Sequence, residues 1–123
     1  MTSTEDTFRV LDADGRVTYT TYSALPNDVH LWDYWTSDPS QSHFRFELVA
    51  FGGYFRIYIV TQPPYQGRAE GLVPTHRHQD ENGRYYICVG PGNEPRTVAE
   101  AMTWYAYWAE RTVEYIASGR AFS

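Results

Sequence analysis

The fold is decided by residues 43–60, which read HFRFELVAFGGYFRIYIV. Phe44, Phe46 and Leu48 alternate with polar residues, and this period of two is typical of a strand with one buried face. The Gly-Gly pair at 52–53 then turns the chain into a second alternating run. We therefore predict an antiparallel hairpin whose strands cover 43–51 and 54–60.

The second strong element is a long C-terminal helix. Thr97 is followed three residues later by Glu100, which is the pattern of a capping box, and Gly119 stands where a C-terminal cap belongs. Apolar residues recur between these caps at helical spacing: Val98, Met102, Tyr105, Ala109, Val113 and Ile116. We expect the opposite face, with Glu110, Arg111 and Glu114, to be an ordinary solvated surface.

The rest of the chain carries weaker signals. Residues 8–20 alternate around Asp14-Gly15 and predict an N-terminal hairpin. Residues 24–42 contain Pro26 and Pro39 and predict an irregular segment whose Trp32, Tyr34 and Trp35 pack onto the core. After Pro63-Pro64, which ends the second strand, we expect a short strand at 71–75, a polar turn-rich segment at 75–83 and an apolar run at 85–89. The predicted class is α+β, with an antiparallel four-stranded meander packed on a C-terminal helix and an extra N-terminal hairpin, in a single domain spanning 1–123.

Composition narrows the function classes. The chain has 123 residues, 42% of them hydrophobic, and a formal net charge of −5, which disfavours a general nucleic-acid binder. No run approaches the roughly 18 apolar residues of a membrane span, and the polar, acidic start is unlike a signal peptide. A single cysteine excludes an internal disulfide, so we expect a cytoplasmic protein. The ten basic residues are all arginines, with no lysine, which fits either arginine-rich codon usage or a protein that handles an acyl group.

Cys88 is the first candidate for chemistry. Between Ile87 and Val89 it reads as a small buried core residue, since free cysteine is among the most buried residue types. As a thiolate it would instead be a strong nucleophile. The polar segment before it, which contains His76, His78, Asp80, Glu81 and Asn82, and the Gly-Pro-Gly loop after it favour the nucleophile.

Three segments in this order resemble the ubiquitin-conjugating enzyme-like (UBC-like) family. They are YIVTQPP at 58–64, HQDENGRYYIC at 78–88 and PRTVAEA at 95–101. The family has a strand ending in a double-proline turn, a His-Pro-Asn segment, a glycine shortly before an Ile/Leu-Cys pair, and a Pro-Thr step into helices. The ten-residue step from His78 to Cys88 matches the family's spacing. The resemblance covers 43–118, leaves 1–42 divergent, and is nearest to the small prokaryotic relatives found beside ubiquitin-like proteins in bacterial, defence-type operons.

The resemblance implies thioester chemistry. Cys88 would take the C-terminal acyl group of a ubiquitin-like protein from a ubiquitin-activating-type enzyme and pass it to an amine on a protein acceptor, with no cofactor of its own. His78 would organise the loop, and Asp80 or Asn82 would assist the acyl transfer. The chain departs from the family at Asp80, which replaces the oxyanion-stabilising Asn, and an ionised Asp cannot donate a hydrogen bond. It also lacks the helix before the first strand and the Trp shortly after the Cys.

Two other readings stay open. One keeps the fold without catalysis, as an adaptor that binds a ubiquitin-like partner. The other is an unrelated α+β ligand-binding or metal-binding domain. His76 and His78 lie two residues apart, so on a strand both would point to one face and Cys88 could be a third zinc ligand. That set lacks a second Cys, and we assign no metal.

Overall fold

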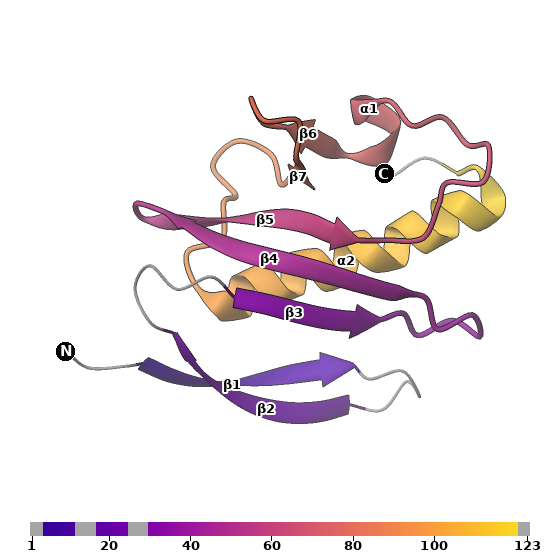
Figure 1. Cartoon of the computed structure of the whole chain (residues 1–123). Coiled ribbons are helices and arrows are strands. Elements are labelled where there is room, and N and C mark those ends of the chain that lie inside the picture. The colour runs from indigo at the N-terminus through magenta and orange to yellow at the C-terminus, as the bar shows by residue number, and fades with distance from the viewer. Residues whose placement is uncertain (1–3, 12–16, 25–29, 121–123) are drawn as a thin grey trace.

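A computed structural model describes residues 4–11, 17–24 and 30–120 of the chain. The elements in chain order are β1 (Thr4–Leu11), β2 (Val17–Ala24), β3 (His30–Trp35), β4 (His43–Phe51), β5 (Tyr54–Thr61), α1 (Leu72–Thr75), β6 (Arg77–Gln79), β7 (Tyr85–Ile87) and α2 (Val98–Ser118). The sheet β3-β4-β5-β7-β6 is antiparallel throughout, and α2 covers one of its faces (Figure 1). The α+β class is confirmed.

The predicted hairpin of β4 and β5 is confirmed, with Phe51 opposite Tyr54 across the two glycines. Phe44, Phe46 and Leu48 are fully buried, as their alternation predicted. Gly52 has φ +65°, a left-handed conformation that side chains rarely adopt, so the turn requires glycine at this position.

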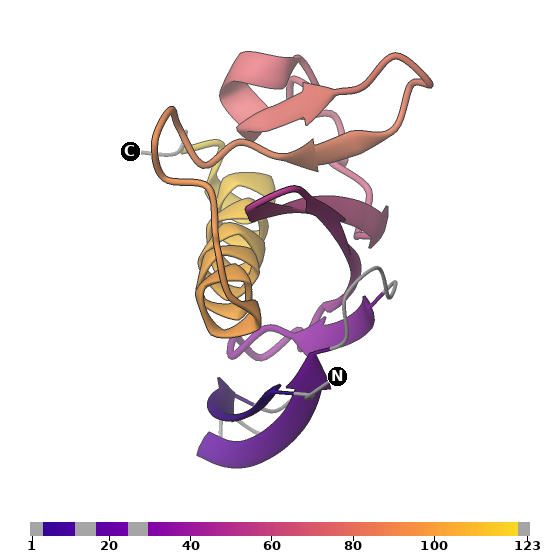
Figure 2. The same ribbon diagram turned by 90° about the vertical axis from the view of Figure 1, so that its left-hand side faces the viewer.

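Helix α2 closes the core from one side of the curved sheet (Figure 2). The Tyr105 ring stacks on Phe46 with 4.7 Å between centroids, and the Trp108 ring meets Phe44 edge-on at 5.9 Å. Both predicted caps are present, because Thr97 Oγ1 accepts the amide of Glu100 at 3.1 Å and Gly119 is left-handed. The Glu100 carboxylate accepts the amide of Arg96. Tyr105 and Trp108 therefore join α2 to β4 through ring contacts in the core.

The sheet has five strands, so the prediction of a four-stranded meander was wrong. Residues 30–35 were expected to be irregular but form β3, whose Trp32 and Tyr34 pair with Phe46 and Phe44 of β4. Tyr34 is buried and Trp32 packs against the core, whereas Trp35 is 40% exposed. The prolines that indicated irregular chain lie on either side of this short strand, and its burial depends on a partner strand distant in sequence.

The segment that precedes Cys88 also differs from the prediction. Residues 72–75 form one helical turn, in which the Thr75 hydroxyl donates to the carbonyl of Gly71 at 2.7 Å, and the expected strand begins instead at Arg77. His76 ends the turn in the left-handed conformation, with φ +49°. Short apolar runs such as Leu-Val-Pro do not distinguish a turn of helix from a strand by pattern alone.

The face of α2 expected to be solvated is in part tethered to the sheet. The Glu110 carboxylate accepts the Tyr34 hydroxyl at 2.6 Å, the Ser37 amide at 2.9 Å and the Ser37 hydroxyl at 3.0 Å. Burial and the hydrogen bond to Glu110 both raise the pKa of Tyr34. This carboxylate therefore ties α2 to the end of β3.

The N-terminal hairpin is confirmed as the antiparallel pair β1 and β2, which forms its own two-stranded sheet. Its predicted turn at Asp14-Gly15 lies outside the described residues.

Candidate functional site

Cys88 lies one residue beyond the end of β7, at the far end of the β6–β7 hairpin from its turn. Its amide donates to the carbonyl of His76 at 3.0 Å, so the ladder of the hairpin continues one pair past the strands. His78 stands opposite Tyr86 in the same ladder. Because alternate residues of a strand share a face, the side chains of Tyr86 and Cys88 are expected on the face of the hairpin that carries His78.

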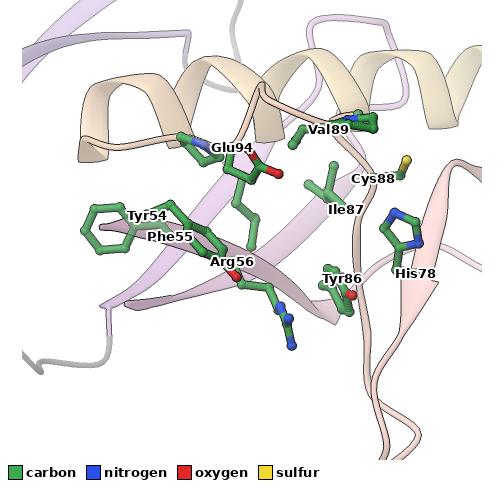
Figure 3. A pocket seen from close by; sticks show the side chains of 13 residues that line it. Tyr54, Phe55, Arg56, His78, Tyr86, Ile87, Cys88, Val89 and Glu94 are labelled. Atoms are coloured by element: carbon green, nitrogen blue, oxygen red, sulfur yellow. The ribbon is translucent and has the colours of Figure 1, made fainter. Parts of the chain in front are cut away.

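His78 and Cys88 share a cavity of about 380 Å³ that we call the sheet-side cavity. Figure 3 shows the thiol of Cys88 and the imidazole of His78 at one end of it, with Tyr54 and Phe55 at the other. The His78 ring lies 5.3 Å from that of Tyr86 and is exposed, whereas Cys88 is half-buried. Cys88 and His78 therefore line the same end of one cavity.

A second hollow of about 540 Å³ lies between the end of β7 and α2, and we call it the helix-side groove. Cys88 and its neighbours Ile87, Val89 and Gly90 line both hollows and form the wall between them. The groove is completed by His76 and by four residues of α2, which are Thr103, Trp104, Tyr107 and Trp108. Cys88 is thus part of the lining of both hollows.

Asp80 stabilises the turn of the β6–β7 hairpin. Its carboxylate accepts the amides of Asn82 and Arg84, both at 2.9 Å, and the hydroxyl of Tyr58 at 3.0 Å. Desolvation acts to raise the pKa of Asp80, but these hydrogen bonds outweigh it and hold the pKa below its usual value. Asp80 and Asn82 do not line either hollow, whereas His78 and Cys88 both line the sheet-side cavity.

Sequence reasoning missed Arg56 and Glu94, which also line the sheet-side cavity. The Arg56 guanidinium lies 4.2 Å from the Tyr86 ring centroid and 4.3 Å from that of Phe51, and it donates to the Tyr58 hydroxyl at 3.2 Å. The alternation of polar and apolar residues along β5 could have indicated Arg56. Glu94 lies in a loop without periodicity, and only the fold brings it to this cavity (Figure 3).

The metal hypothesis assumed that His76 and His78 share one face of a strand, and the structure does not support this assumption. His76 precedes β6 in a left-handed conformation, so His76 and His78 do not alternate along one strand as the hypothesis required. Among residues whose placement is described, no group of three His, Cys, Asp or Glu side chains could hold a metal ion.

No family model matches the chain, and no curated protein or solved structure matches it. Within the described part of the chain, none of the helices combines the length and the apolar character that crossing a membrane requires.

Proposed function

We propose that this protein carries a ubiquitin-like protein as a C-terminal thioester on Cys88 and transfers it to an amine of a protein acceptor. The pathway would be a bacterial ubiquitin-like conjugation system, with antiviral defence as one context. The observation that carries the proposal is the half-buried Cys88 at the end of β7, beside His78 and between two hollows. Acyl transfer favours this arrangement because the attacking group must reach the carbonyl of an acyl group held at Cys88. The order of motifs shared with UBC-like enzymes adds support.

The reaction has two steps. The Cys88 thiolate attacks the thioester of the charged activating enzyme, a new C–S bond forms, and the enzyme's thiolate leaves. An acceptor amine then attacks the carbonyl on Cys88, the C–S bond breaks, and the amine loses a proton. His78 lies at the Cys88 end of the sheet-side cavity and is the group that we assign to receive that proton.

Asp80 and Asn82 act in this scheme as positioning residues. The Asp80 carboxylate fixes the amides of Asn82 and Arg84, and so fixes the turn that joins His78 to Cys88. An aspartate suits this role because it accepts several hydrogen bonds at once. The scheme therefore differs from that of UBC-like enzymes with Asn at this position.

The absence of lysine fits the proposal. A carrier without side-chain amines cannot transfer its cargo to its own lysines. Introducing a lysine at Glu94, on the rim of the sheet-side cavity, should therefore produce a self-conjugate that resists reductant. The same change at Glu81, which is exposed and lines neither hollow, is the matched control and should produce none.

The decisive experiment mixes the protein with its activating enzyme, ubiquitin-like protein and ATP. The expected product is an adduct that a thiol reductant cleaves and that is absent from Cys88→Ala. In Cys88→Ser the adduct should become an oxygen ester that survives the reductant. Binding of the ubiquitin-like protein without any adduct would instead identify a non-catalytic adaptor and refute the proposal.

A further inference from the structure

The two hollows at Cys88 differ in charge. The sheet-side cavity is lined by Arg56, His78 and Glu94 as well as apolar residues. The lining of the helix-side groove contains no arginine, aspartate or glutamate; its titratable side chains besides those of Cys88 and Tyr107 are limited to His76, and Trp104, Tyr107 and Trp108 supply its aromatic rings. The groove is also the larger of the two, at about 540 Å³ against 380 Å³, and both volumes lie in the range of ligand sites.

Acyl transfer requires two approaches to the same carbonyl, one for the chain that carries it and one for the attacking amine. An amine is charged in water and has to lose a proton, so it suits the sheet-side cavity with Glu94 and His78. The helix-side groove then remains for the carried chain. That chain is attached at Cys88, and each extended residue spans about 3.3 Å, so its last few residues reach the groove.

We propose that the helix-side groove binds the C-terminal residues of the carried protein and selects uncharged, apolar side chains directly before the terminal glycines. This inference rests on the proposed thioester function. An apolar side chain would bury its surface against Trp104 and Tyr107, whereas an arginine or glutamate would lose water without gaining an ionic partner. This desolvation cost is what makes the groove favour apolar over charged side chains before the terminal glycines.

The test uses synthetic peptides as the probe. Three acetylated peptides end in Leu-Leu-Gly-Gly, Arg-Arg-Gly-Gly and Glu-Glu-Gly-Gly, each as the thioester of one small thiol. The Cys88 thiolate attacks the peptide carbonyl, a C–S bond to Cys88 forms, and the small thiolate leaves and takes up the proton that Cys88 lost. Intact-mass spectrometry follows the rate of this exchange at neutral pH, without an activating enzyme.

We expect the Leu-Leu peptide to exchange about tenfold faster than the charged peptides, which corresponds to one partly buried apolar side chain. Tyr107→Ala should remove most of this preference. Its control is Trp35→Ala, because the two rings are 42% and 40% exposed and Trp35 does not line the groove. Thr103→Glu should favour the Arg-Arg peptide, and its control is Thr61→Glu, an exposed threonine outside both hollows.

Each other outcome overturns the inference. Equal exchange of all three peptides, or a preference that survives Tyr107→Ala, would leave the thioester function standing and refute only the selectivity. Faster exchange with an octanoyl thioester than with any peptide would assign the groove to a fatty-acyl chain. A dimer that Tyr107→Ala dissociates would assign it to a second copy of this chain. If no peptide exchanges and Cys88 also forms no adduct with the complete enzyme system, the proposed function fails together with the inference.

Discussion

Replacing Trp108 with phenylalanine should loosen the connection between α2 and the segment that leads to Cys88. The indole Nε1 of Trp108 donates to the carbonyl of Thr75 at 3.1 Å, and both residues are buried. Thr75 directly precedes His76, whose carbonyl accepts the Cys88 amide. This hydrogen bond therefore connects α2 to the residue that precedes His76 and the β6–β7 hairpin.

The expected cost has two parts. A phenylalanine cannot donate, so the buried carbonyl of Thr75 loses this partner, at a cost of about 1–3 kcal/mol. The smaller ring also leaves space beside Phe44 and Phe46, whose ring centroids lie 5.9 and 6.1 Å from that of Trp108, which adds about 1 kcal/mol. The sum is about 3 kcal/mol, or a decrease of about 12 °C in Tm for a domain of this size.

Urea unfolding measures this change, and Trp104→Phe is the matched control. Trp104 lies one turn earlier on α2, is half-buried, and its indole makes no hydrogen bond among the described residues. We expect the control to lose about 1 kcal/mol or less. If the two variants lose the same stability within about 0.5 kcal/mol, the hydrogen bond to Thr75 does not hold the hairpin and the reasoning is refuted.

Three further predictions concern the caps, the tether and acid stability. Thr97→Ala removes the N-cap of α2 and should cost about 1 kcal/mol in urea unfolding, and a loss below about 0.3 kcal/mol would contradict the capping role. Tyr34→Phe removes the hydrogen bond to Glu110 and should cost about 1 kcal/mol without changing the m-value; an unchanged midpoint would show that the tether adds no stability. The pKa values of Asp38 and Asp80 lie below the ordinary 3.8, because hydrogen bonds to these carboxylates outweigh desolvation. Their ionised forms contribute their full stabilisation above the unfolded-state pKa, and this contribution is lost as pH falls from about 4 through the folded-state pKa. The free energy of unfolding of Asp80→Asn should therefore fall less steeply with acid than that of the unchanged protein. An equal slope in both proteins would show that Asp80 does not contribute.

The surroundings of Cys88 show how much of the candidate site could be predicted from the sequence. The polar segment and the spacing from His78 singled out two residues that line one cavity, but the sequence did not predict the β6–β7 hairpin that brings them there. The role of Asp80 in the turn was not predictable, since an aspartate in a polar segment reads equally well as an acid, a ligand or a cap. Glu94 and Trp104 line the hollows next to Cys88 because of the path of the loop after β7 and the orientation of α2, which no local pattern predicts.

Local pattern by itself determined the β4–β5 hairpin and the limits of α2. Alternation, paired glycines and capping residues act over a few positions, and their energetics do not depend on distant parts of the chain. Tertiary structure decided that residues 30–35 form a strand, that 72–75 form a turn of helix, and that Cys88 separates a charged hollow from an apolar one. These features depend on burial against partners distant in sequence, and burial is a property of the packed chain rather than of any short segment.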